Sequence, residues 1–152
     1  MTVHTFSQTE LLQPQVATLN AGIVGMGFIG EVHARAIRAN GHNVYAVSAA
    51  NIEVARDGAK KVSADFALTT EEMMSDPAID VVHICTPNIF HAEIASLALQ
   101  SGKHVICEKP LAISVADASR LTALAKEKNL VAIQGRALGE SKIRYITVKI
   151  ID

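Results

Sequence analysis

A lysine placed to act on a bound substrate follows an apolar run in the second half of the chain. The run 104–107 reads as a buried strand, and Glu108-Lys109-Pro110 comes directly after it. Open α/β sheets bind ligands outside the carboxyl ends of their strands, so a catalytic Lys109 would stand beside such a ligand. Its amine could hydrogen-bond a substrate hydroxyl and, if buried, exchange the proton of that hydroxyl. The alternative is that the three residues form a solvated loop between a strand and a helix.

A glycine-rich loop earlier in the chain has the spacing that holds a dinucleotide. It follows an apolar strand and leads into a segment with apolar residues at helical spacing, which ends at Gly41. Gly25 would allow the tight turn, Gly27 the close approach of backbone to a pyrophosphate, and Gly30 the close packing of helix on strand. The first N–H groups of the helix would face the phosphates. The alternative is a purely structural turn. The pattern predicts a cofactor site formed by Gly25, Gly27, Phe28, Ile29 and Gly30.

The end of the second predicted strand bears on the choice of cofactor. The glycine-loop pattern expects an acidic residue about twenty positions on, where it binds the adenosine ribose. The segment 47–51 has none; we expect Ser48 to contact the cofactor there, and the first carboxylate is Glu53 in the following helix. The missing carboxylate leaves room for a 2′-phosphate, although the nearest cation, Arg56, lies further along that helix. The cofactor is thus NAD or NADP, and we expect a preference for NADP or use of both.

A second polar cluster closes the fourth predicted strand. Thr86-Pro87-Asn88 ends that strand, and His91 follows in the next segment. These groups lie next to the point where the strand order reverses and could contact the nicotinamide ribose, with Asn88 and His91 as hydrogen-bond donors. The alternative is structural: Pro87 stiffens the turn, Asn88 caps the next helix and His91 lies in its first turn.

The bulk composition is that of a soluble globular domain. A chain of 152 residues with 49% hydrophobic residues can bury its own core, and 4% aromatic residues favours parallel strands covered by helices. The net charge of −1 gives no reason to expect nucleic acid or a membrane as a partner. Cys85 and Cys107 lack metal-ligand or disulfide spacing, so we expect no metal site and two reduced thiols in a cytoplasmic protein. His33 and His83 have apolar neighbours and are expected in the core.

Strand-like and helix-like segments alternate six times along the chain. The pattern predicts an α/β fold, a doubly wound parallel sheet with strand order 3-2-1-4-5-6 and one extra C-terminal strand over 142–152. Thr69 and Glu72 have capping-box spacing for a short helix, and Ser114 opens another capped helix. The expected strands are 19–24, 43–48, 65–67, 80–85, 104–107 and 130–134, and the expected longer helices are 28–40, 52–62, 89–100 and 114–128.

Three motifs in this order resemble the N-terminal half of the glucose–fructose oxidoreductase, inositol dehydrogenase and rhizopine-catabolism (Gfo/Idh/MocA) family. They are the loop 25–30 with His33, the strand 79–88 with His91, and the segment 102–112, and the likeness covers 19–136. The resemblance implies a Rossmann domain and hydride transfer between NAD(H) or NADP(H) and a hydroxyl carbon of a sugar, cyclitol or related compound. It implies a nicotinamide side lined by Thr86, Pro87, Asn88, His91 and Glu108, and a Lys109 that contacts the cofactor and serves in catalysis.

The segment after residue 136 departs from that family. We expect an N-terminal arm over 1–17, the dinucleotide-binding domain over 18–136, and in 137–152 a single strand of the second domain that family members use for substrate and assembly. The chain is thus expected to be truncated: either an oxidoreductase whose pocket is completed elsewhere, or a dinucleotide-binding module without catalysis of its own. The last strand would have unpaired edges, so a homo-oligomer through it is a hypothesis.

Overall fold

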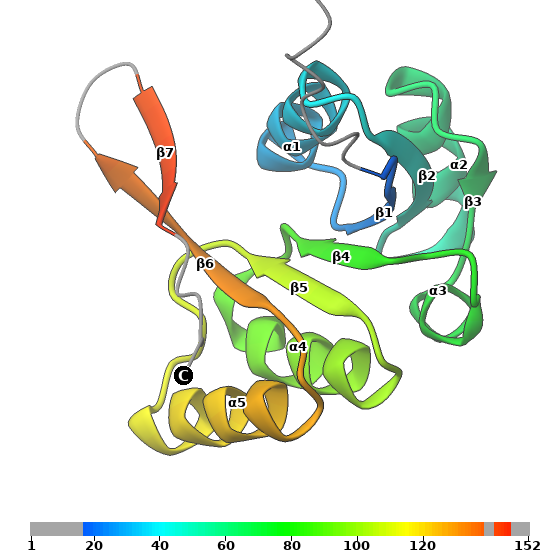
Figure 1. The fold of residues 1–152 in the computed structure, drawn as a ribbon. Helices are drawn as coiled ribbons and strands as arrows, with labels where there is room; N and C mark the ends of the chain where they lie inside the picture. The colour runs from blue at the N-terminus through cyan, green and yellow to red at the C-terminus, as the bar shows by residue number, and fades with distance from the viewer. Residues whose placement is uncertain (1–16, 139–141, 147–152) are drawn as a thin grey trace, which may run out of the picture.

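Seven strands form one sheet in the computed structural model, which describes residues 17–138 and 142–146. The order is β3-β2-β1-β4-β5-β6-β7; the first six strands are parallel, and β7 pairs antiparallel with β6 (Figure 1). The predicted fold class and the order 3-2-1-4-5-6 are confirmed. The strands are β1 (Asn20–Val24), β2 (Asn43–Ser48), β3 (Phe66–Ala67), β4 (Val81–Ile84), β5 (His104–Cys107), β6 (Ala132–Leu138) and β7 (Lys142–Ile146).

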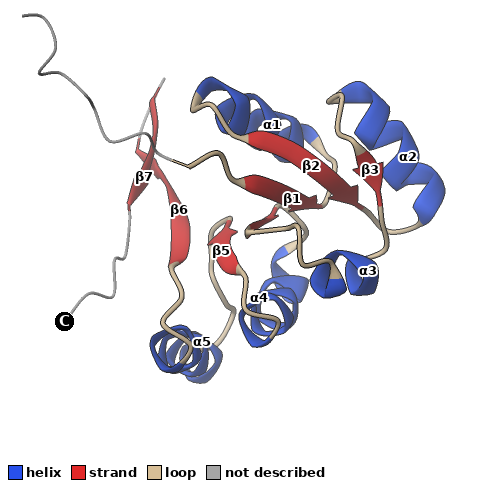
Figure 2. Ribbon diagram, turned by 45° about the vertical axis from the view of Figure 1, so that its right-hand side comes forward, coloured by secondary structure: helices blue, strands red, loops and turns tan. Residues whose placement is uncertain are grey.

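Helices cover both faces of the sheet. Figure 2 shows α1 and α2 on one face and α4 and α5 on the other. The helices are α1 (Phe28–Ala39), α2 (Ile52–Lys61), α3 (Thr70–Ser75), α4 (His91–Gln100) and α5 (Val115–Glu127), with a short 3₁₀ helix, η1 (Asn88–Phe90), before α4. This two-sided cover makes the fold doubly wound, as the alternation of segments predicts.

Side-chain caps fix where three of the helices begin. Asn51 caps α2 and Ser114 caps α5 through hydrogen bonds from backbone N–H groups to their side chains. The predicted capping box of α3 is confirmed, because Thr69 and Glu72 each accept the backbone N–H of the other. The N-cap of α1 is Gly27, which has no side chain to cap the helix. The first N–H groups of α1 therefore remain available to a ligand.

Each face of the sheet buries its own apolar cluster, because successive strand residues point to opposite faces. In β1, Ile23 joins the cluster under α1 and α2, whereas Val24 joins the cluster under α3, α4 and α5. All residues of β4 are buried, as expected of a central parallel strand. Burial of side chains as large as Leu99 and Leu121 stabilises the fold by roughly 2 kcal/mol each.

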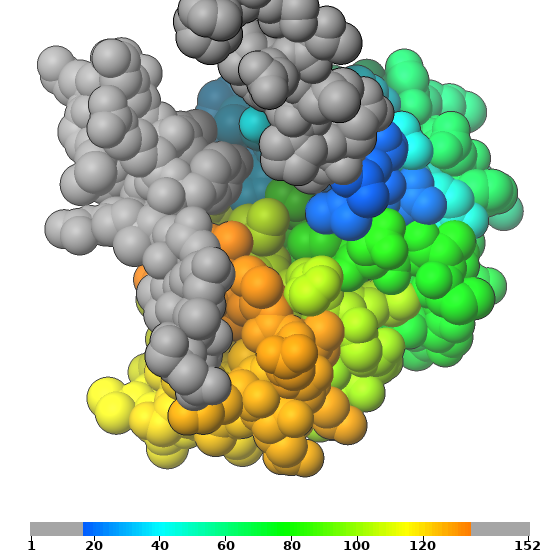
Figure 3. Space-filling model, viewed as in Figure 1, coloured from blue at the N-terminus to red at the C-terminus, as the bar shows by residue number. Residues whose placement is uncertain are grey.

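The amino-terminal ends of the central strands lie side by side across the face shown in Figure 3, coloured blue, green, yellow-green and orange. The Asp80 N–H donates to the Asn20 carbonyl and the His104 N–H to the Asp80 carbonyl, each at 3.0 Å. The Val105 N–H continues the row by donating to the Val131 carbonyl at 2.9 Å. The carboxyl ends of the same strands, where a ligand is expected, therefore lie together at the opposite edge.

The C-terminal strands differ from their expected bounds. β6 continues to Leu138 instead of ending at Gln134, because its second half pairs with β7, from Gln134↔Ile146 to Leu138↔Lys142. Of the predicted last strand, 142–146 is described as β7, and the expected arm 1–17 lies outside the described residues except for residue 17. The division into domains stays a prediction. No helix in the described part of the chain is long and apolar enough to span a membrane.

Candidate functional site

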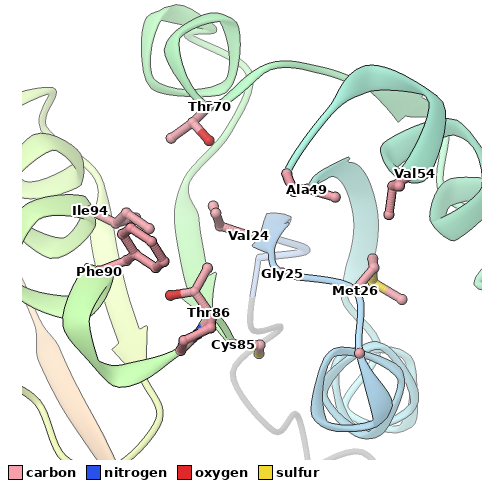
Figure 4. Close-up of a pocket in the computed structure, with 13 residues that line it drawn as sticks. Val24, Gly25, Met26, Ala49, Val54, Thr70, Cys85, Thr86, Phe90 and Ile94 are labelled. Carbon is pink, nitrogen blue, oxygen red and sulfur yellow. The ribbon is translucent and has the colours of Figure 1, made fainter.

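A cavity of about 650 Å³ opens at the carboxyl ends of β1 and β4, where the strand order reverses. Phe90 and Ile94 form one side and Ala49 and Val54 the other, with the end of β1 between them (Figure 4). The cavity brings together four predicted site residues, Gly25, Gly27, Thr86 and Pro87. Its full lining is Val24, Gly25, Met26, Gly27, Ala49, Ala50, Val54, Thr70, Cys85, Thr86, Pro87, Phe90 and Ile94. Its size, mostly apolar wall and place in the sheet are those of a cofactor site.

The three predicted glycines have different tasks. Gly25 has a φ of +97°, and its N–H donates to the Ser48 carbonyl at 2.8 Å, so this turn requires glycine. A Cβ on Gly30 would collide with the carbonyl oxygen of Gly25. Because glycine has no Cβ, α1 can pack this closely on the loop. A Cβ on Gly27 would meet no atom within 4 Å. Gly27 therefore keeps open the space in the cavity wall that a pyrophosphate needs.

The start of α1 offers backbone donors to an anion. The first N–H groups of an α-helix have no partner within the helix and carry a partial positive charge. Phe28 and Ile29 supply two of these groups at the uncapped end of α1. The Phe28 side chain is 73% exposed, and neither side chain lines the cavity. Both residues are therefore placed to act through their backbone.

Thr86 carries a buried hydroxyl that has no hydrogen-bond partner in the described part of the chain. Among the described residues, Oγ1 of Thr86 is the only buried side-chain oxygen or nitrogen that forms no hydrogen bond. Thr86 also lines the cavity. An unsatisfied buried hydroxyl costs about 1–3 kcal/mol, which a ligand atom in the cavity would recover. The orphaned hydroxyl, the open space at Gly27 and the uncapped α1 together fit a dinucleotide.

The two cysteines do not supply a nucleophile to this site. The pKa of the Cys85 thiol in the cavity wall is raised far above its ordinary value, mainly by burial and to a smaller extent by the charge of Glu108. Burial also raises the pKa of Cys107 to about 12. Both thiols are therefore protonated at neutral pH, when they react slowly.

The end of β2 gives the cavity an apolar wall. Ala49 and Ala50 line it, and the Asn51 side chain is occupied by the Val54 N–H at 2.9 Å. No carboxylate occurs among the described residues that line the cavity. Ser48 is fully buried and outside the lining, and its hydroxyl bonds that of Thr70 at 2.9 Å. The role of Ser48 as a cofactor contact stays a prediction.

His91 joins the two polar motifs from within the core. It is fully buried; its Nε2 lies 2.8 Å from the Thr86 carbonyl oxygen and its Nδ1 2.6 Å from that of Pro110. Its expected place in the first turn of the helix is confirmed. The alternative that Asn88 caps this helix is wrong, because Asn88 is exposed and η1 separates it from α4.

Glu108 lies at the end of β5, where its N–H donates to the Ile84 carbonyl at 3.0 Å. Its carboxylate oxygen lies 2.9 Å from Nε2 of His33, a residue buried on α1 as expected. Lys109 follows in an exposed bend and is joined to Pro110 by a cis peptide bond. The described residues leave the Lys109 side chain exposed, and its role in catalysis stays a prediction. Neither Glu108 nor Lys109 lines the cavity.

Sequence reasoning missed most of the cavity wall. Met26, Val54, Phe90 and Ile94 carry no chemical signal, and only their places in the loops and helices that follow β1, β2 and β4 could have indicated them. Thr70 was missed because the capping pattern draws attention to its neighbour Thr69 instead. Within 17–138 and 142–146, no group of three or more His, Cys, Asp or Glu side chains could hold a metal ion.

Known proteins are similar to this chain in sequence and fold. Residues 19–135 match the model of the Gfo/Idh/MocA oxidoreductase family, NAD-binding Rossmann fold. Levoglucosan dehydrogenase of Pseudarthrobacter phenanthrenivorans is 36% identical over 123 residues, which cover 74% of this chain and 32% of that protein. Inositol 2-dehydrogenase of Salmonella typhimurium is 36% identical over 118 residues, covering 74% and 34%. The chain thus spans about a third of the length of the curated relatives it matches.

Solved structures agree with the sequence matches. Levoglucosan dehydrogenase in complex with NADH and levoglucosan superposes with a TM-score of 0.72 at 35% identity, over 76% of this chain and 34% of that one. KijD10, a 3-ketoreductase from Actinomadura kijaniata in complex with NADP and TDP-benzene, gives a TM-score of 0.73 at 26% identity, over 78% and 37%. With its confirmed strand order and its cavity at the glycine loop, the chain belongs to the Gfo/Idh/MocA oxidoreductase family, and residues 19–135 are its NAD(P)-binding Rossmann domain.

Proposed function

We propose that the chain is the cofactor-binding part of an oxidoreductase that transfers hydride between NAD(P) and a hydroxyl carbon of a sugar or cyclitol. The observation that carries the proposal is the unpartnered Thr86 hydroxyl in the wall of a cavity that Gly27 keeps open. The names of the relatives point to the substrate class, since one acts on levoglucosan and another on inositol. The cofactor would supply the hydride acceptor or donor.

The residues of the chain have separate tasks in this proposal. The N–H groups of Phe28 and Ile29 bind the pyrophosphate, and Gly27 lets it come close to the backbone. The Thr86 hydroxyl donates a hydrogen bond to the nicotinamide half. Lys109, whose side chain is exposed, hydrogen-bonds the substrate hydroxyl through its amine.

We also propose that the site accepts both NAD and NADP. Ala49 and Ala50 offer no carboxylate to bind the ribose hydroxyls or to repel a 2′-phosphate. The side chain of Asn51 is engaged in capping α2 and is not available to the ribose. The structures of relatives with NADH and with NADP are consistent with either choice. We expect the affinities for NADH and NADPH to differ by less than about tenfold.

A dinucleotide-binding module without catalysis is the second candidate. It is favoured by Lys109, which is exposed and outside the lining of the cavity. The two candidates agree on cofactor binding and differ only in turnover.

One experiment separates the candidates. NADH and NADPH are titrated into the chain by calorimetry, and reduction of NAD and NADP is then followed with a panel of cyclitols and sugars. Lys109→Ala is the test variant, and Lys128→Ala, an exposed lysine at the end of α5, is the matched control. Turnover lost only in Lys109→Ala supports the enzyme, and binding without turnover supports the module. Failure to bind either cofactor contradicts both.

Assembly and location complete the proposal. β7 is the outermost strand of the described sheet, so its free edge could pair with that of a second copy and form a homo-oligomer. A monomer at high concentration in sedimentation would contradict this. The two unpaired thiols, Cys85 and Cys107, suit a reducing compartment, and we propose a cytoplasmic location.

A further inference from the structure

Three side chains from distant parts of the sequence form a hydrogen-bonded row through the core. Nδ1 of His83 on β4 lies 2.9 Å from Nδ1 of His33 on α1, and Nε2 of His33 lies 2.9 Å from Oε1 of Glu108 after β5. The two imidazole rings meet edge to face, with centroids 5.1 Å apart. His33 thus contacts both strands that lead to the polar motifs, and it sits on the helix that begins at the glycine loop.

The direction of these hydrogen bonds follows from the chemistry of the groups. A carboxylate only accepts, so Nε2 of His33 donates to Glu108. The pKa of His83 is lowered to about 3, mainly by burial and to a smaller extent by the charges of His33 and His42. His83 is therefore neutral at pH 7. A neutral His83 can still donate or accept at Nδ1, which lets the row form without a charge on that ring.

Glu108 belongs to this row and lies close to the candidate site without lining the cavity. Its side chain is 23% exposed, and its second oxygen, Oε2, lies 3.4 Å from the backbone nitrogen of Lys109. Its charge also acts on Cys85, which lines the cavity. The carboxylate therefore lies on the β4–β5 side of the cavity, away from β2. A dinucleotide that spans the reversal of strand order would place its nicotinamide half on this side and its adenosine half over β2.

We propose that His33 is a positioning residue for the nicotinamide half of the site: it fixes the Glu108 carboxylate and, through it, the Lys109 segment. This inference rests on the proposed binding of a nicotinamide dinucleotide. A histidine that only fills the core would affect stability and treat every part of the ligand alike. A positioning residue affects the nicotinamide half selectively.

The test compares NADH with ADP-ribose, which keeps the pyrophosphate and the adenosine but lacks nicotinamide. His33→Leu removes both hydrogen bonds, whereas His33→Gln keeps an N–H donor near the position of Nε2. The matched control is His104→Leu at the other end of β5, where Nδ1 of the histidine accepts the Val131 N–H at 3.1 Å. Glu108→Ala removes the same contact from its more exposed partner and keeps His33 in the core, and it decides the matter if His33→Leu does not fold.

We expect His33→Leu and Glu108→Ala each to weaken NADH binding roughly tenfold and ADP-ribose binding by less than about twofold. His33→Gln should restore most of the NADH affinity, and His104→Leu should leave the ratio of the two affinities unchanged. Equal losses for NADH and ADP-ribose, or no loss for either, would overturn the inference while leaving the proposed function intact. A wild-type chain that binds NADH no better than ADP-ribose would also overturn it. A wild-type chain that binds neither ligand would overturn the proposed function and this inference together.

Discussion

Gly25 and Cys85, which follow β1 and β4 and both line the cavity, lie so close together that no side chain fits between their backbones. A Cβ on Gly25 would lie 2.7 Å from both the carbonyl carbon and the carbonyl oxygen of Cys85. The Cys85 N–H in turn donates to the Val24 carbonyl at 2.8 Å. The glycine loop and the Thr86 motif therefore take their positions from the same backbone contact.

Substitutions at Gly25 and Gly27 should affect different properties, the first mainly stability and the second mainly NADH affinity. Gly25→Ala should lower the free energy of unfolding by more than about 2 kcal/mol, because the side chain meets backbone and the φ is positive. Gly27→Ala should cost less than about 1 kcal/mol, because its Cβ has open space, yet it should weaken NADH binding roughly tenfold or more. Urea unfolding and calorimetric titration measure the two effects.

A control for these variants is Gly102→Ala. Gly102 has a φ of +77° and open space for a Cβ, and it lies after α4, outside the lining of the cavity. It should lose about 1 kcal/mol of stability and keep its affinity for NADH. If Gly27→Ala binds NADH as the wild type does, the role given to Gly27 is wrong.

Thr86→Val should make the ligand-free chain more stable and a poorer binder. Valine keeps the shape and removes the unpartnered hydroxyl, so the free energy of unfolding should rise by about 1 kcal/mol. NADH affinity should fall roughly fivefold, because a donor to the ligand is lost. The matched control is Thr70→Val, which breaks the bond to Ser48 and should be less stable than wild type. A loss of stability in Thr86→Val would show that its hydroxyl has a partner in the free chain.

Ala49→Asp should make the cofactor site selective for NADH. The new carboxylate would stand in the cavity wall at the end of β2, where it can accept the ribose hydroxyls and repel a 2′-phosphate. The ratio of NADH to NADPH affinity should rise roughly tenfold. Asn51→Asp adds the same charge two residues later and keeps the cap of α2, so it controls for charge alone. An equal shift in both variants would contradict the placement of the ribose at Ala49.

His83 should make the chain sensitive to acid. Its pKa falls from 6.5 in the unfolded chain to about 3 in the fold, chiefly through burial, so the unfolded state binds more protons between these values. Stability from this residue is present above pH 6.5 and is lost as pH falls toward 3, at about 1.4 kcal/mol per pH unit. Urea unfolding at several pH values should give a flatter profile between pH 6 and 4 for His83→Asn than for wild type. Parallel profiles would contradict the burial of a neutral His83.

More of the fold than of the candidate site could be predicted from the sequence. Gly41 and the Thr69–Glu72 capping box are local signals, and both helix boundaries that they predict occur close to where they were expected. The end of β6 was not predictable in this way, because Leu138 is held in a strand by its pairing with Lys142 across a connection. Local patterns state which segments are strands and helices, whereas the length of an edge strand depends on its partner.

The site shows the same division. Gly25, Gly27 and Thr86 were predicted because their residue types and spacing carry chemistry, and the cavity brings them together. The contact between His33 and Glu108 joins residues 75 positions apart, and it exists only because the folded sheet places β4 beside β1 and β5 beside β4. Apolar neighbours predicted that His33 is buried, but nothing near it in the sequence indicates its partner.

The most direct test of the account is to map NADH binding onto the chain by amide NMR. A saturating titration of the ¹⁵N-labelled chain should shift the amide signals of the glycine loop, of Ala49 and of Thr86, with smaller effects at the far ends of the strands. Gly27→Ala should require roughly tenfold more NADH, or more, to produce the same shifts. Saturable binding that shifts signals elsewhere, or no shifts at all, would contradict the claim that this cavity is the dinucleotide site.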